Sequence, residues 1–273
     1  MTAVLIALLL LIPNAVDDGG QAPRQVIVRT IVLDPGHGGQ DRGAVGSSGL
    51  CEAELTYAIA LGLRDLILAD PELRRAGVRV VLTRDGDSDR SLEERAAIAN
   101  REGGDLFISI HANSCRARSA HGAETYILSL TASDEHARRV AEIENQAVEQ
   151  YESAIEESDD LRLILFDVIH NSYIEESLFL AERIQASFNR SLNLDDRGVK
   201  QAPFRVLKGV AMPAVLVEVD FISNPERERM LRSESYRRRI AQSLLRAIVA
   251  YKRQKERGYA VGGARETEGS RTQ

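Results

Sequence analysis

The segment VIVRTIVL, residues 26–33, is rich in β-branched side chains and runs directly into the turn DPG at residues 34–36. This composition predicts a buried β-strand that ends at the turn. Helical periodicity follows over residues 52–68, and residues 78–83 predict a second strand. A strand, a helix and a strand in this order are typical of an α/β sheet.

The alternation of strands and helices continues along the chain. Ser91 and Glu94 form a capping-box pattern, which predicts a helix that reaches about Asn100. Further strands are predicted at residues 106–110, 122–128, 206–207 and 214–219. Asn224 and Pro225 then begin a last amphipathic helix that reaches about Lys252. We therefore expect an α/β domain with helices on both faces of its sheet.

Composition excludes several classes of protein. The chain has 273 residues, of which 44% are hydrophobic and 28% charged, so it is globular and long enough for a real core. Its net charge of −6 argues against nucleic acid as a partner, because phosphate binding needs a basic surface. Two cysteines are too few for a disulfide scaffold or a thiolate zinc finger.

Residues 131–176 interrupt the alternation. They are predicted to be helical and carry 13 acidic residues against three arginines, which leaves the rest of the chain at +4. This asymmetry favours docking of an acidic helical insert over a polar cleft. The alternative is a solvated helical hairpin.

The N-terminus begins with ten apolar residues at positions 3–12, too few to cross a bilayer. The run resembles the apolar region of a secretory signal peptide, although no Lys or Arg precedes it. We expect a signal peptide or N-terminal anchor over 1–15, a linker over 16–25 and an exported protein of the periplasm or cell envelope. A buried strand or helix is the alternative. No later segment is apolar enough to span a membrane, and residues 253–273 are expected to be a disordered tail.

Polar residues with metal-ligand chemistry follow several of the predicted strands. His37 lies on a glycine-flanked turn, Glu52 begins the first helix, and His111 ends the strand that starts at residue 106. Two histidines and one glutamate are a known ligand set for catalytic zinc. Glu218 ends a later strand and is the carboxylate that a metal-assisted hydrolysis needs as its base. Each signal is weak alone, but the combination is hard to explain as scaffold.

The chain resembles the zinc-dependent N-acetylmuramoyl-L-alanine amidases of the third type, which cleave peptidoglycan. The resemblance covers about residues 26–252 and rests on the stretches IVLDPGHGGQDRGAVG, GLCEAELTYAIAL, LFISIHANS, GAETYILS and MPAVLVEVDFISNP. It implies one Zn²⁺ held by His37, Glu52 and His111, with Glu218 as the catalytic glutamate. It also implies a single α/β domain with a mixed, mostly parallel sheet of about six strands.

Two positions near this set need a choice. Glu54 is the rival of Glu52, which is preferred because the family places the ligand three residues after the glycine that is Gly49 here. Asp220 stands where the family usually has glycine. Its carboxylate either approaches Glu218 and raises the pKa of that group or points away.

The acidic insert falls where some periplasmic members of the family carry a regulatory helix that plugs the active site. In such members a glutamate on that helix occupies the open position at the zinc. Glu142 is the first candidate for that glutamate and Glu144 the second; the alternative is that both are exposed helix acids. If the plug is present, a partner protein must displace it, one that acts at cell division.

The remaining polar residues are left open. Cys51 and Cys115 flank two of the ligands and form either a disulfide or two free thiols. Asn113 orients a ligand or the substrate, or satisfies a turn. Three further histidines are expected at the surface or on helix faces: His121, His136 and His170.

The resemblance thus implies an enzyme that hydrolyses the amide bond between N-acetylmuramic acid and L-alanine in peptidoglycan and that is autoinhibited. Its partners are the peptidoglycan substrate and an activator protein that displaces the insert. Two alternatives remain: a catalytically silent peptidoglycan-binding or regulatory module on the same scaffold, and a zinc peptidase or deacetylase that acts on another amide.

Overall fold

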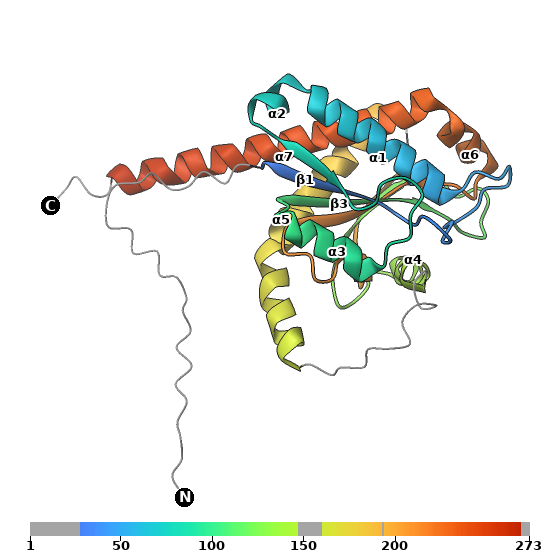
Figure 1. The fold of residues 1–273 in the computed structure, drawn as a ribbon, viewed down its shortest axis with the longest axis horizontal. Helices are drawn as coiled ribbons and strands as arrows, with labels where there is room; N and C mark the ends of the chain where they lie inside the picture. The colour runs from blue at the N-terminus through green and yellow to red at the C-terminus, as the bar shows by residue number, and fades with distance from the viewer. Residues whose placement is uncertain (1–27, 147–159, 193, 269–273) are drawn as a thin grey trace, which may run out of the picture. The chain divides into compact units, whose positions relative to one another are not determined.

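Six strands in the described part of the chain form one sheet in the spatial order β2-β1-β3-β6-β4-β5 (Figure 1). This computed structural model describes residues 28–146, 160–192 and 194–268. The strands are β1 (Thr30–Pro35), β2 (Arg79–Leu82), β3 (Leu106–Asn113), β4 (Ala123–Leu128), β5 (Asp196–Ala202) and β6 (Ala214–Phe221). All neighbours pair in parallel except β4 and β6, which are antiparallel. The sheet is therefore mixed and mostly parallel, as the resemblance implied.

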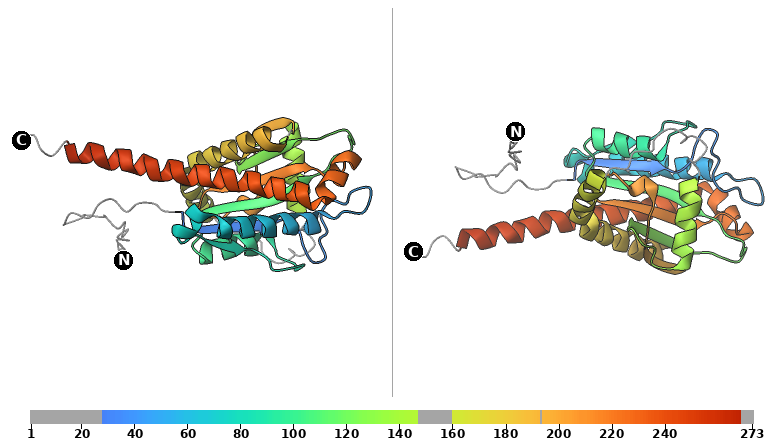
Figure 2. Two further views of the ribbon diagram at one scale, coloured as in Figure 1. Left: turned by 90° about the horizontal axis from the view of Figure 1, so that it is seen from above. Right: turned by 90° about the horizontal axis from the view of Figure 1, so that it is seen from below.

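Helices cover both faces of this sheet (Figure 2). They are α1 (Glu52–Ala69), α2 (Pro71–Arg75), α3 (Leu92–Arg101), α4 (Glu135–Gln146), α5 (Asp160–Leu192), α6 (Pro225–Arg232) and α7 (Glu234–Glu268). Side chains alternate along each strand, so Ile31 and Leu33 belong to a buried cluster that includes residues of α1, α5 and α7, whereas Val32 belongs to a second cluster with residues of α3 and α4. All the strands belong to the compact unit Ile27–Gln254. The predicted α/β architecture with two helical layers is confirmed.

The predicted and observed strands differ at two places. Residues 206–207 form part of the 3-10 turn η1 (Arg205–Leu207) rather than a strand, because a pair of apolar residues also suits a short buried turn. The strand β5 was not predicted at all. It lies at the edge of the sheet with mostly half-exposed polar side chains, so it lacks an apolar pattern.

The helix ends also differ from expectation. The last predicted helix is interrupted at Ser233, and its second part, α7, continues to Glu268. The expectation of a disordered tail from residue 253 is therefore wrong as far as Glu268. Residues 252–257 are Lys, Arg, Gln and Glu, which favour helix wherever they follow one. The predicted signal peptide or anchor and the linker lie outside the described residues, as do residues 147–159 of the insert.

The capping box places a buried cation under the end of β1. Ser91 Oγ accepts a hydrogen bond from the Glu94 amide at 3.1 Å, and the Glu94 carboxylate accepts one from the Ser91 amide at 2.8 Å, so α3 begins where predicted. Arg95, one residue further, donates to the fully buried carboxylate of Asp34 at 2.8 Å. Asp34 also accepts hydrogen bonds from the hydroxyls of Thr83 and Ser109. This network fixes the turn that follows β1.

Replacing Asp34 by Asn should destabilise the protein by about 3–5 kcal/mol, because Arg95 would remain buried without a counter-charge. Burial alone would raise the pKa of Asp34, but Arg95 and the two hydroxyls hold it below its usual 3.8. The stabilisation is therefore present above pH 3.8 and is lost as the pH falls through the folded pKa. Urea unfolding at pH 7 and at pH 3 tests this. Asp65→Asn, at an exposed pair with Arg64, is the control and should change little; equal effects of both variants would contradict the account.

Candidate active site

His37 is held in a strained loop directly after β1. Its φ of 59° lies in the left-handed region, which is uncommon for a residue other than glycine. Arg95 donates to its carbonyl oxygen at 2.8 Å, and its Nδ1 lies 2.8 Å from the carboxylate of Asp41. A Cβ added to Gly43 would lie 2.6 Å from the imidazole ring. The loop therefore fixes the ring and directs its Nε2 inward.

Glu52 enters the site from the N-terminus of α1, which favours a carboxylate electrostatically. Its side chain is buried, and each oxygen accepts one main-chain hydrogen bond at 2.9 Å, from Ala44 and from Ala112. The preceding loop is held by Glu228 of α6, whose carboxylate accepts hydrogen bonds from the amides of Ser48 and Leu50. Glu228 was not singled out from the sequence, where it resembles an ordinary exposed helix acid.

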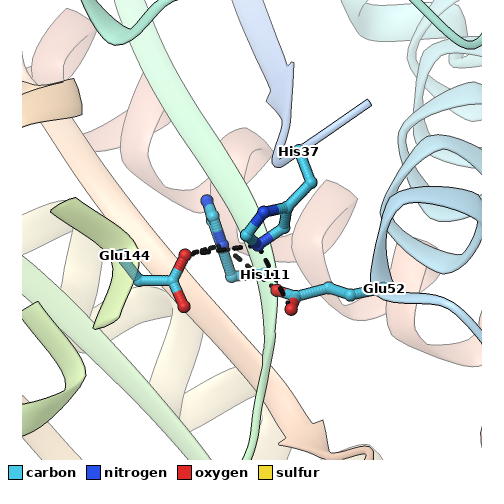
Figure 3. Close-up of side chains that lie close together, drawn as sticks. All are labelled: His37, Glu52, His111 and Glu144. Atoms are coloured by element: carbon cyan, nitrogen blue, oxygen red, sulfur yellow. Dashed lines mark hydrogen bonds and ion pairs between the residues drawn. The ribbon is translucent and has the colours of Figure 1, made fainter. Parts of the chain in front are cut away.

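His111 completes a buried group of side chains that point toward one another (Figure 3). It lies near the end of β3, and its Nδ1 is 3.2 Å from Glu52 Oε1. His37 Nε2 lies 3.2 Å from the other oxygen of Glu52. A Cβ on Gly36 would fall 2.4 Å from the His111 ring, so this turn must be glycine. The structure thus brings together the three residues selected from the sequence as a ligand set. Glu54, the rejected rival, is exposed on α1.

Glu144 of α4 is the fourth member of this group. Its Oε2 lies 2.8 Å from His111 Nδ1 and 3.3 Å from His37 Nε2, and its side chain is only 10% exposed. The ligand atoms of the four residues all lie within 4.8 Å of one another. We call this set, His37, Glu52, His111 and Glu144, the His–Glu cluster.

The preference for Glu142 over Glu144 is corrected by the structure. Glu142 is half-exposed and pairs with Arg138 on the outer side of α4. The buried residues of α4 are Ala137, Val140 and Ala141. Glu144 lies three residues after Ala141 and four after Val140, so helical periodicity places it on the buried face of α4. The same periodicity places Glu142 outside that face. That signal was present in the sequence.

Contacts at both ends hold α4 against the sheet. Near its C-terminal end, Asn145 donates to the carbonyl of Pro203 at 2.9 Å and accepts from the Arg205 amide at 2.8 Å. Near its N-terminal end, His136 Nε2 lies 2.9 Å from a carboxylate oxygen of the buried Glu124. One of the three histidines expected at the surface or on a helix face is thus a docking contact.

The electrostatics of the cluster are set by two imidazoles packed against two carboxylates. Burial would lower the pKa of His37, but Glu52 and Glu144 raise it well above 6.5. For His111, burial is likewise outweighed by Glu144 and Glu52, which raise the pKa to about 10. Burial would raise the pKa of Glu52, but the two imidazoles lower it. Protons on the imidazoles therefore balance the carboxylates here.

Glu218 lies beside the cluster. It pairs with His111 in the register of β3 and β6 and with Glu124 in the register of β6 and β4. It is fully buried, and neither carboxylate oxygen has a hydrogen-bond partner in the described structure. Burial, together with the charges of Glu144 and Glu52, raises its pKa well above 4.5. Asp220 points away and pairs with Arg227 at 2.6 Å, so the second of the two expectations for it is confirmed.

A model of the N-acetylmuramoyl-L-alanine amidase family matches residues 31–250. The chain belongs to this family. The N-acetylmuramoyl-L-alanine amidase AmiA of Escherichia coli (strain K12) is 38% identical over 241 residues, which cover 88% of this chain and 79% of that protein. The crystal structure of N-acetylmuramoyl-L-alanine amidase from Clostridium difficile 630 is similar with a TM-score of 0.62 and 25% identity, over 82% of this chain and 97% of that one. The CwlD amidase of Clostridioides difficile, solved in complex with the GerS lipoprotein, has a TM-score of 0.60 and 25% identity over 82% and 98% of the two chains.

The residues of this amidase-family site fit a metal ion. His37 Nε2 and Glu144 Oε2 are buried and lie within ion-pair distance of other atoms of the cluster, but neither makes a hydrogen bond of good geometry, which is costly unless another group completes them. Two imidazoles and a carboxylate match the donor set of catalytic zinc sites. The contact between His37 Nδ1 and Asp41 is the kind of outer hydrogen bond that orients a metal-binding histidine.

The other residues singled out from the sequence lie as follows. Cys51 and Cys115 are both free, so the alternative of two thiols is the one that the structure contains. His121 is exposed and pairs with Asp195. The side chain of His170 lies outside the described residues. None of the described helices has the length and apolar character needed to cross a bilayer.

Metal binding to this cluster should release protons. Because Glu52 and Glu144 raise the pKa of both His37 and His111, these imidazoles hold protons more firmly than free histidine does. A metal ligand must be neutral imidazole, so Zn²⁺ should displace protons from the site as it binds. Calorimetric titration of Zn²⁺ in buffers of different ionisation enthalpy measures the number of protons displaced. The exposed-site variant His121→Ala should give the same value, and an enthalpy independent of the buffer would contradict the prediction.

Proposed function

We propose that this chain is a zinc-dependent amidase that hydrolyses the amide bond between N-acetylmuramic acid and L-alanine in peptidoglycan. The observation that carries the proposal is the position of Glu218, buried and unpaired beside a cluster with the donor set of catalytic zinc. Residues 26–252 form the catalytic domain, and residues 131–176 form a regulatory insert within it.

In this mechanism His37, Glu52 and His111 hold the zinc. Zinc supplies a Lewis acid for the amide carbonyl and lowers the pKa of water toward about 7. Glu218 removes a proton from the attacking water at one carboxylate oxygen. It then delivers that proton to the nitrogen of L-alanine as the C–N bond breaks, and the lactyl group leaves as a carboxylate. The raised pKa of Glu218 brings it closer to the neutral range in which both transfers are efficient.

The insert makes the enzyme autoinhibited in this proposal. The Glu144 carboxylate lies against the two imidazoles, in the position that water and substrate must occupy during the reaction. Zn²⁺ held by His37, Glu52 and His111 would leave one positive charge, which the carboxylate of Glu144 complements. For the site to open, the contacts of Asn145 and His136 must break. A protein activator breaks them by binding α4. A solved relative, the CwlD amidase, forms a complex with a lipoprotein.

The enzyme acts in wall remodelling or daughter-cell separation, and the apolar N-terminus directs its export to the periplasm or cell envelope. AmiA of Escherichia coli carries the name of an amidase of this bond, which supports the substrate class. A second candidate function is that of a catalytically silent peptidoglycan-binding module. The contact of Glu144 with the cluster favours it, because such a module would also have a blocked site.

Replacing Glu218 by Gln should lower hydrolysis by about 10²- to 10⁴-fold, because the proton carrier is lost. The test uses the full chain with Glu144→Ala, loaded with zinc, and measures stem peptides released from labelled peptidoglycan. Zinc content should stay at that of the parent chain. If the parent releases no stems although it is folded and loaded, the silent-module alternative gains support; if Glu218→Gln keeps full activity, the role of Glu218 is wrong.

Glu144→Ala should raise the basal rate without an activator, because it opens the coordination position. Asn145→Ala should also raise it, by about tenfold, since two hydrogen bonds that dock α4 are lost. Glu142→Ala is the matched control on the same helix and should leave the rate unchanged. Equal rates for all three variants and the parent chain, measured by release of stem peptides, would contradict autoinhibition by Glu144.

A further inference from the structure

Most of the buried polar atoms that make no hydrogen bond lie at the site. In the described residues they are His37 Nε2, Glu144 Oε2, both oxygens of Glu218 and Asn113 Nδ2; the one other, Arg183 Nε, belongs to α5, and its guanidinium lies over the ring of Phe179. Native proteins leave few such atoms, and each of them asks for an explanation. Zinc and the reacting water account for the first three residues. Asn113 has no such account, although it lines the same hollow as His37, Glu52 and Glu144.

The backbone of Asn113 is fixed while its side chain is uncommitted. Asn113 is only 3% exposed, and its carbonyl oxygen accepts a hydrogen bond from the Ile222 amide at 2.9 Å. It lies two residues after His111 on β3, where the register with β6 shifts by one residue. Bulges of this kind are common beside active sites, where they redirect side chains. The extra residue at this irregularity belongs to β6, and Asn113, opposite it on β3, lines the hollow together with His37, Glu52 and Glu144.

The other residues that line the hollow indicate what kind of ligand the Asn113 carboxamide would contact. The further lining of the hollow comes from the loop after β1, from the end of β3 with the residue that follows it, and from α4. Most of these residues are small or apolar (Gly43, Ala44, Ala112, Val140 and Ile143), and two are polar (Asp41 and Ser114). A carboxamide donates and accepts as a peptide group does. A small apolar residue with its peptide group, such as the L-alanine of a stem peptide, fits both properties.

We propose that Asn113 is a substrate-binding residue whose Nδ2 donates a hydrogen bond to the peptide carbonyl of the stem residue next to the scissile amide. This inference rests on the proposed function. It makes the hollow a subsite for the start of the stem peptide, covered by Ile143 and Val140 while α4 is docked. Asn113 Nδ2, which makes no hydrogen bond in the protein without substrate, makes one only when substrate is bound.

The proposal separates stability from binding. Removing a buried donor that has no partner should leave the thermal midpoint unchanged or raise it. Asn100 is the matched control, because its carboxamide donates to Gly209 at 2.7 Å and accepts from Ala211 at 2.9 Å on the other side of the domain. Asn100→Ala should therefore lower the thermal midpoint and leave substrate binding alone.

The experiment uses the zinc-loaded full chain with Glu144→Ala and Glu218→Gln, which binds without turnover. Calorimetry measures the affinity for N-acetylmuramoyl-L-Ala-D-Glu and for an analogue in which the carbonyl of L-alanine is replaced by a methylene group. Asn113→Ala should weaken binding of the first ligand about tenfold, and the analogue should bind both chains equally. In the chain that retains Glu218, the same substitution should raise KM about tenfold and change kcat less.

Two results would overturn the inference: unchanged affinity in Asn113→Ala, or a fall in its thermal midpoint as large as that of Asn100→Ala with loss of zinc. A failure of the proposed function looks different. In that case the chain that retains Glu218 releases no stem peptide, whereas the calorimetric comparison still reports whether Asn113 binds the carbonyl.

Discussion

The contact between Glu52 and the two imidazoles is the interaction on which the rest of the site depends. One buried carboxylate lies 3.2 Å from His37 and 3.2 Å from His111, and main-chain amides on both sides hold it there. Such a group is tolerated in a core only if its charge is balanced. The turn after β1, the start of α1 and the end of β3 are all built to keep this balance, with Asp34 and Glu228 fixing the turn and the loop behind them.

The same balance explains why α4 rests over the two imidazoles without any covalent link. Glu144 adds a second carboxylate to a pair of imidazoles whose positive charge its own presence helps to maintain. Asn145 and His136 then fix the helix at its two ends through contacts that lie outside the cluster. Docking of α4 and blocking of the site therefore depend on different residues. Glu144 blocks the site, and the contacts at the two ends of α4 determine how readily Glu144 leaves it.

The sequence predicted the helices and strands that have a regular apolar pattern, and with them the site residues near their ends. His37, Glu52, His111 and Glu218 stand at strand or helix ends, and parallel strands bring such ends to one edge of a sheet. The strand β5 escaped because an edge strand of polar residues carries no apolar period. Glu142 was preferred over Glu144 because the periodicity of α4 was not applied to its acids. The side-chain partners of Glu228 and Asn145 come from segments distant in sequence, so no local pattern could reveal them.

A crystal structure of the zinc-loaded full chain, with zinc located by its anomalous scattering, tests the central claim most directly. The account predicts one zinc peak bonded to His37, Glu52 and His111, with a Glu144 oxygen as the fourth ligand and Glu218 beside it but not bonded. A peak bonded elsewhere would contradict the metal site, and a peak with the three ligands but with Glu144 turned away from it would contradict closure by α4.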